Sequence, residues 1–304
     1  MLRLSDRVAN LLPNLTCNPC IIGAEGVSEA SEGAVIVSQG RVGPRGLEDL
    51  RDELSGRDLA IIRQVADLHL MSGRQVEAVF FLPEDHQSAL SAARAARRAL
   101  ERLTRDGLLV RLRRRQGGVR AGSGSWIYGL GPVGHRVLSL DGARPRYYRQ
   151  PSAMFTEHTL ATSELVVQLT RATRSGHGQL LGLEAEPRCW RRFSGATGRL
   201  TLKPDLFVAL GVGDYEDRFF VEIDRSTEHL PTVVRKCRLY DLYYQSGIEQ
   251  HRHGVFPKVC LVVPNPERAD RLRRVIDHAR HLEASLFVVS TADTAMDALL
   301  GGQA

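Results

Sequence analysis

Two apolar segments close together in the chain, residues 202–210 and 219–224, carry acidic side chains in sequences that are otherwise typical of buried strands. Asp205 lies in the first segment, and Glu222 and Asp224 lie in the second. A glycine-rich tetrapeptide follows the first segment, which predicts a hairpin of two antiparallel strands. A lone charge on a buried strand is costly unless another charge or a metal ion compensates it. The chain is therefore expected to fold around a sheet that carries an acidic site.

The patterns around these two strands predict an α/β domain over residues 157–296. An amphipathic helix is expected to begin it, followed by a strand around residues 180–190 that carries Glu184 and Glu186. After the hairpin, Pro231 is expected to open a helix, because proline is tolerated in the first helical turn. The last expected elements are a strand at 258–263, a helix at 266–282 and a strand at 286–290.

Positive charge is concentrated in one part of the chain. Residues 87–121 contain ten arginines but only Glu101 and Asp106 as acids, a local net charge of +8. The whole chain has a net charge of +6, so the remaining residues are slightly acidic. A solvated helix face usually mixes glutamate with basic residues, whereas a localised basic stretch is typical of a nucleic-acid contact. This stretch therefore predicts that the protein binds nucleic acid.

The basic stretch follows two shorter helical segments. A sequence similar to a capping box at residues 55–58 predicts the start of the first helix. A turn at residues 71–74 is expected to lead to the second. The third helix is expected over about residues 87–106, with alanines and leucines on one face. Its opposite face carries Arg94, Arg97, Arg98, Arg102 and Arg105.

Two short strands joined by a basic, glycine-rich tip are expected after the third helix. The strands are predicted at residues 108–112 and 125–130. Three helices followed by such a hairpin resemble a winged helix-turn-helix. That resemblance implies that the third helix enters the major groove of double-stranded DNA and that the hairpin follows the backbone or the minor groove. The arginines of the tip, which would contact phosphate, are Arg113, Arg114, Arg115 and Arg120.

The residues Pro204, Asp205 and Glu222, in the expected order of elements, resemble the PD-(D/E)xK nuclease superfamily. This resemblance implies a restriction-endonuclease-like αβββαβ core with a mixed sheet. It also implies that the two acids hold Mg²⁺ or Mn²⁺, cations that prefer oxygen ligands. The superfamily's lysine stands two residues after the second acid, where this chain has Asp224.

Three interpretations of that departure remain open. In the first, Lys236 on the following helix supplies the missing amine. In the second, Asp224 is a third metal ligand, and Lys236 or Arg235 pairs the phosphate. In the third, the site is degenerate and the domain binds DNA without cutting it. Two further candidates are Tyr240, one helical turn after Lys236, and Glu186 as an additional ligand.

Motifs in the second half carry a closer resemblance. They are His158-Thr-Leu, Lys203-Pro-Asp205 and the segments 220–228 and 235–240. Following the winged-helix pattern in this order, they resemble the replication-relaxation family of bacterial plasmids and integrative elements. The similarity covers about residues 52–290. It implies a role in the replication and relaxation of plasmid DNA, with other replication or mobilisation proteins as further partners.

The chain is expected to divide into five parts and to reside in the cytoplasm. No apolar run is long enough for a membrane span, the N-terminus lacks a secretory signal, and five cysteines do not make a disulfide framework. Cys17 and Cys20 form a lone CxxC, which supplies too few ligands for a structural zinc site. The expected parts are a poorly ordered tail at 1–50, a winged helix-turn-helix at 52–142, a basic linker at 143–156, a nuclease-like domain at 157–296 and a tail at 297–304.

Two functional hypotheses follow from these features. The first is a DNA-processing protein of a mobile element that acts as a metal-dependent endonuclease. Its catalytic residues would be Asp205, Glu222, Asp224 and Lys236, and its metal ligands the three acids among them. The alternative is a non-catalytic accessory or regulatory protein that binds DNA and carries a degenerate nuclease-like domain.

Overall fold

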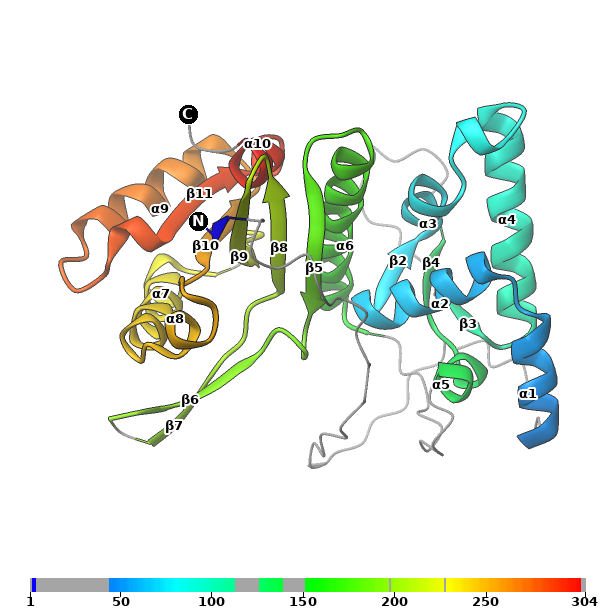
Figure 1. Cartoon of the computed structure of the whole chain (residues 1–304), viewed down its shortest axis with the longest axis horizontal. Coiled ribbons are helices and arrows are strands. Elements are labelled where there is room, and N and C mark those ends of the chain that lie inside the picture. The colour runs from blue at the N-terminus through cyan, green and yellow to red at the C-terminus, as the bar shows by residue number, and fades with distance from the viewer. Residues whose placement is uncertain are drawn as a thin grey trace.

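The protein has a mixed α/β fold in which helices surround a central sheet (Figure 1). In this computed structural model the described residues contain ten α-helices, one six-stranded sheet and two smaller sheets. No helix in the described part of the chain is both long and apolar enough to cross a membrane. The described residues are 2–3, 44–112, 126–138, 151–196, 198–226 and 228–301.

The N-terminal part consists of helices around a three-stranded antiparallel sheet with the strand order β2-β4-β3. The three helices expected before the hairpin are present as α2, α3 and α4. Each begins after a serine whose side chain takes part in a capping box. The elements are α1 (Pro44–Glu53), α2 (Gly56–Leu68), β2 (Leu70–Ser72), α3 (Gly73–Phe80), a 3-10 turn (Pro83–Asp85), α4 (Ala89–Arg105), β3 (Leu109–Leu112), β4 (Ile127–Leu130) and α5 (Pro132–Leu138).

Two expectations for this part were wrong. The segment expected to be a turn at 71–74 instead contains the end of strand β2, which pairs with β4. The pairing buries Leu70 and Met71, two apolar residues that a surface turn would have exposed. Helix α1 begins at Pro44, so it lies partly within the range expected to be a poorly ordered tail.

The C-terminal part contains the larger sheet, with the strand order β11-β10-β9-β8-β5. Strands β5, β8 and β9 are antiparallel neighbours, and β9, β10 and β11 run parallel. The short strand β1 (Leu2–Arg3) pairs with β9. The other elements are α6 (Ala153–Arg174), β5 (Gln179–Ala185), β6 (Arg191–Gly195), β7 (Gly198–Leu202), β8 (Leu206–Val212), β9 (Tyr215–Ile223), α7 (Leu230–Gln245), α8 (Ile248–His253), β10 (Lys258–Val263), α9 (Pro266–His278), a 3-10 turn (Ala284–Leu286), β11 (Phe287–Thr291) and α10 (Ala295–Leu300).

Helices cover both faces of this sheet, which explains why its central strands are apolar throughout. Alternate residues of a strand point to opposite faces. Val208 and Val221 pack on the side of α6, whereas Phe207 and Phe220 pack in a second core with residues of α7 and α9. The predicted mixed sheet is therefore confirmed, together with the hairpin of β8 and β9.

The connection between β5 and β8 differs from the expectation. The strand expected to extend to residue 190 ends at Ala185, because the Glu186–Pro187 bond leads into a turn. A separate hairpin of β6 and β7 follows, so Leu202 ends β7 rather than opening β8. Helices α8 and α10 were not predicted, α10 overlaps the expected C-terminal tail, and α9 ends at His278.

Helix α6 joins the two parts into one packed structure. It lies between the larger sheet and the N-terminal helices (Figure 1), and one continuous apolar core includes residues from both sides. Ser163 of α6 donates a buried 2.7 Å hydrogen bond to the carbonyl of Leu70, and Arg174 donates one to the carbonyl of Val79. Most of the expected linker at 143–156 lies outside the described residues.

Candidate active site

Asp205 lies at the end of the larger sheet, immediately before β8. Its carboxylate accepts two hydrogen bonds, one from the backbone N–H of Ile223 at 2.7 Å and one from the His158 Nε2 at 3.0 Å. Its own backbone N–H donates to the carbonyl of Val221. Asp205 is therefore fixed to β9 by its backbone N–H and one carboxylate oxygen, and to α6 by its other carboxylate oxygen.

Glu222 faces Asp205 across the strand pair. The antiparallel register joins Leu206 to Val221, which places Asp205 opposite Glu222 one residue further along. The Glu222 side chain is only 6% exposed. Directly opposite residues on antiparallel strands have their Cβ atoms about 5 Å apart. The two acids predicted from the sequence to form a site are thus neighbours at one end of the sheet.

Helix α7 supplies two hydrogen-bond donors to Glu222. The Lys236 Nζ lies 3.2 Å from one carboxylate oxygen, and the Tyr240 hydroxyl donates to the other at 2.6 Å. Lys236 also lies 3.4 Å from Glu228, whereas the adjacent Arg235 is exposed and bonds Thr232. The amine is therefore beside the second acid although it comes from a helix instead of the strand.

The surroundings of Glu222 disfavour its charged form. Burial, followed by the nearby charge of Asp205, raises the pKa of Glu222 to about 7, although Lys236 and Tyr240 oppose this shift. Burial disfavours the charged Lys236, but the charges of Glu222, Glu228 and Asp205 together hold the pKa of its amine above the ordinary value. The site thus concentrates negative charge around one ammonium group.

Asp224 belongs to a different pair. The Nε of Arg268 on α9 donates to one of its oxygens at 2.9 Å, and the backbone N–H of Ser226 donates to the other. The Nη2 of Arg268 lies 2.8 Å from the same Asp224 oxygen and donates to the carbonyl of Glu228. Among the described residues, Asp224 shares no hydrogen-bond or ion-pair partner with the carboxylates of Asp205 and Glu222. Within the described ranges, no three His, Cys, Asp or Glu side chains are arranged to hold a metal ion.

Two residues of the site were not predicted. His158 pairs with Asp205, and that hydrogen bond raises the pKa of the imidazole. His158 is seven residues before Leu165 and so shares the buried face of α6, which is a signal available in the sequence. Arg268 similarly precedes Leu272 and Ile276 on the buried face of α9, where an arginine requires an acidic partner.

Glu186, the additional ligand candidate, lies in the turn after β5. Its backbone N–H donates to the carbonyl of Asp205 at 3.3 Å. Burial, followed by the charge of Asp205, raises the pKa of the Glu186 carboxyl. Its carbonyl is bonded by His69, which ends α2 of the N-terminal part. Glu186 thus lies beside the acid pair and links it to the N-terminal half.

Comparison with known families identifies the chain. The model of the replication-relaxation family matches residues 62–259, which are 198 of the 304 residues. The chain belongs to the replication-relaxation family. The match runs from α2 to β10 and so includes α4, both acids and Lys236. No curated protein and no solved structure is significantly similar to this chain.

The basic face of α4 in this replication-relaxation protein is largely exposed. Arg94, Arg97, Arg98 and Arg105 lie on the surface. Arg102 differs, because its guanidinium donates to Asp58 at 2.8 Å, the residue that closes the capping box of α2. The arginines expected in the hairpin tip, Arg113, Arg114, Arg115 and Arg120, lie outside the described residues.

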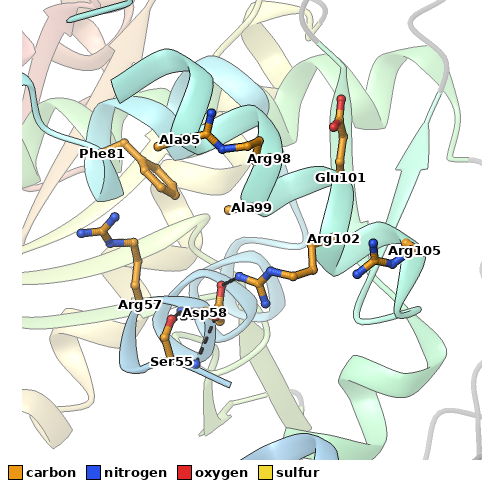
Figure 2. Close-up of a pocket in the computed structure, with 10 residues that line it drawn as sticks. All are labelled: Ser55, Arg57, Asp58, Phe81, Ala95, Arg98, Ala99, Glu101, Arg102 and Arg105. Atoms are coloured by element: carbon orange, nitrogen blue, oxygen red, sulfur yellow. Dashed lines mark hydrogen bonds and ion pairs between the residues drawn. The ribbon is translucent and has the colours of Figure 1, made fainter. Parts of the chain in front are cut away.

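A depression of about 830 Å³ opens between α4 and the start of α2 (Figure 2). Arg98 and Arg105 of α4 line this depression, and Figure 2 shows Arg102 directed at Asp58. On the α2 side, the guanidinium of Arg57 lies 4.9 Å from the centre of the Phe81 ring. The N-terminus of α2 is already capped by Ser55 and Asp58, so the arginines alone give this depression its positive charge.

Proposed function

We propose that this replication-relaxation protein is a DNA-processing enzyme that cleaves a phosphodiester bond with the help of Mg²⁺ or Mn²⁺. The observation that carries the proposal is the position of the Lys236 Nζ, 3.2 Å from Glu222 and therefore at the acid pair. Two opposed carboxylates and one ammonium are the groups needed to bind a divalent cation and a phosphate together.

The order of elements supports the assignment to a nuclease fold. Helix α6, strands β5, β8 and β9, helix α7 and strand β10 follow the αβββαβ order of a restriction-endonuclease-like core, with the β6–β7 hairpin inserted. In the N-terminal part, three helices, the order β2-β4-β3 and the basic α4 support a winged helix-turn-helix. The two assignments together favour DNA as the substrate.

The donor set at the sheet end fits a hard divalent cation. Asp205 and Glu222 would hold it, since Mg²⁺ is usually bound through one or two carboxylates and keeps several waters. Burial, followed by the charge of Asp205, raises the pKa of Glu222, and a bound cation would favour its charged form. Asp224 does not fit this role, because Arg268, its partner, is only 5% exposed and cannot turn away from it, whereas the 43% exposed Lys236 can leave Glu222. A bound ion would stabilise charge on the phosphate and lower the pKa of its coordinated water.

The protein's own side chains would prepare the site for that chemistry. Lys236 is 43% exposed, so its ammonium can leave Glu222 and donate to a phosphate oxygen. Tyr240 and the backbone N–H of Ile223 fix the orientation of the two carboxylates. His158 holds Asp205 from the opposite helix. The exposed arginines of α4 would bind the DNA backbone and give the complex a strong salt dependence.

A non-catalytic DNA-binding role is the second candidate. It is favoured by one observation: every carboxylate oxygen of Asp205 and Glu222 already accepts a hydrogen bond from a protein donor. In that case the polar network would stabilise the domain, and the protein would act as an accessory factor beside other replication or mobilisation proteins of a plasmid. Both candidates place the protein in the cytoplasm with double-stranded DNA.

A plasmid-nicking assay separates the two candidates. The full chain is incubated with supercoiled plasmid in Mg²⁺, in Mn²⁺ and in EDTA, beside Asp205→Asn and the exposed control Asp270→Asn. We expect metal-dependent conversion to nicked or linear DNA, at least about 100-fold slower for Asp205→Asn. Equal or absent nicking for wild type and Asp205→Asn would support the non-catalytic role.

A further inference from the structure

The hairpin of β6 and β7 leaves the larger sheet at the end where Asp205 lies (Figure 1). Residues 187–204, which form it and its two connections, contain four arginines, one lysine and no acid. A run of 18 residues without a carboxylate is unusual on a surface, where both signs of charge are normally mixed. The arginines of this run are divided between an inner face that packs on the domain and an outer face that is exposed to solvent.

The inner face of the hairpin is fixed to the domain. Phe193 and Leu202 are buried in the core that contains α7, and the Phe193 ring lies 5.0 Å from that of Tyr243. Arg191 also attaches the inner face to the domain, because it forms ion pairs with Glu184 and the buried Glu249 at 3.0 and 3.1 Å. The base of the hairpin therefore holds a fixed position relative to the acid pair.

The outer face carries only groups that bind phosphate. Because side chains alternate along each strand, the cross-strand pairs Arg192–Thr201 and Ser194–Arg199 point away from the core. Arg192, Ser194 and Arg199 are exposed. Arginine, serine and threonine are among the side chains that contact DNA phosphates. Carboxylates, which would repel a phosphate, are missing from these positions.

The outer face continues directly to the acid pair. Lys203 lies two residues after Thr201 and just beyond β7, and its ammonium lies 4.5 Å from the centre of the ring of Trp190, the residue before β6. Two residues later the chain reaches Asp205. From Arg199 to Asp205 an extended chain spans about 20 Å, which is the length of several nucleotides. The hairpin is thus a row of phosphate-binding groups that ends at Asp205.

We propose that the outer face of β6–β7 binds the DNA backbone next to the phosphate held at Asp205 and Glu222. A two-stranded ribbon has the dimensions of a DNA groove, and its positive charge matches the backbone. The proposal rests on the proposed function for the identity of the substrate. Its consequence is a second DNA contact, separate from α4, that sets the position of the cleaved bond along the duplex.

Binding without cleavage tests this contact. The affinity of the full chain for a fluorescent 30-base-pair duplex is measured by anisotropy in EDTA at several salt concentrations. Removing one phosphate contact lowers the salt slope by about 0.9, which corresponds to about an eightfold loss of affinity at 0.1 M salt. We expect this loss for Arg199→Ala and little change for Arg199→Lys. The control Arg171→Ala removes one exposed arginine near the opposite end of α6.

The outcomes separate this inference from the proposed enzyme activity. A lower salt slope for Arg199→Ala but not for Arg171→Ala supports the hairpin contact, whether or not the wild-type protein nicks plasmid. Equal slopes for wild type and Arg199→Ala overturn it, even if wild type cleaves. A wild-type protein that does not bind the duplex overturns it as well.

Discussion

The Lys236 ammonium and the Glu222 carboxylate lie 3.2 Å apart, although they belong to different elements and are 14 residues apart in sequence. The contact places an amine from α7 beside the acid pair, whereas the resemblance to the PD-(D/E)xK superfamily implies a lysine on the strand itself. Asp224, at the usual position of that amine, is instead paired with Arg268. The acid pair therefore has a positive charge beside it although residue 224 is an aspartate.

Glu222→Gln is expected to stabilise the protein at high pH in the absence of metal. The folded-state pKa of Glu222 is raised from 4.5 to about 7, so the carboxyl stabilises the fold fully below pH 4.5 and loses this contribution as the pH rises through 7. Glutamine does not ionise and avoids the loss. Urea unfolding in EDTA should show the variant more stable than wild type at pH 8, and a smaller difference at pH 5.

The partly exposed Glu228→Gln is the control for that experiment, because it also changes one acid near Lys236. If Glu222→Gln is less stable than wild type at pH 8, the ion pair with Lys236 outweighs the cost of burial.

Asp205→Asn is expected to lower the pKa of His158. The hydrogen bond from the imidazole to Asp205 is the largest cause of its raised pKa, and an amide cannot replace the negative charge. In the wild type the pair stabilises the fold below about pH 6.5, and this contribution is lost as the pH rises through the raised pKa. NMR titration of the His158 ring measures the shift, with Asp214→Asn in the β8–β9 turn as control. An unchanged His158 pKa would contradict the pairing.

Arg268→Met is expected to lower the free energy of unfolding by about 3–5 kcal/mol. The Arg268 and Asp224 side chains are only 5% and 9% exposed, so removing the cation leaves a buried carboxylate without an opposite charge. The double variant with Asp224→Asn should recover part of the loss in a double-mutant cycle. Additive effects of the two substitutions would show that the pair does not act as a unit.

The arginines of α4 are expected to differ in their roles. Arg94→Ala and Arg98→Ala should each weaken duplex binding and lower its salt slope by about 1. Arg102→Ala should instead reduce stability by about 1 kcal/mol, because Arg102 bonds the capping residue Asp58 and is 40% exposed. Anisotropy and urea unfolding distinguish the two effects. A salt slope reduced as much by Arg102→Ala as by Arg98→Ala would contradict this division.

Much of the fold was predictable because its signals are local. The apolar runs of β8, β9 and β10 and the separated faces of α4 are present in consecutive residues. The β6–β7 hairpin lies in the gap between the strands expected at 180–190 and 202–210, and it was missed because each of its strands has only five residues. Strand β2 was missed because three residues are too few to show the alternation of apolar and polar side chains that marks a strand. Its position also depends on pairing with the distant β4.

The site was predictable only as far as it depends on strand neighbours. Asp205 and Glu222 could be joined because a hairpin places them opposite each other. The partner of Asp224 could not be identified from the sequence, since Arg268 lies 44 residues away on α9. Tertiary packing decides whether such a carboxylate faces an arginine or a metal ion. The same holds for His158, which reaches Asp205 from α6.

The rate of plasmid nicking by Lys236→Met, compared with Arg235→Met, tests the central claim most directly. The two variants lose one positive charge at adjacent positions of α7, but only Lys236 contacts Glu222. We expect single-turnover nicking to fall about 100- to 1,000-fold for Lys236→Met and to remain near the wild-type rate for Arg235→Met. Equal rates for the two variants would contradict the assignment of Lys236 to a phosphodiesterase site.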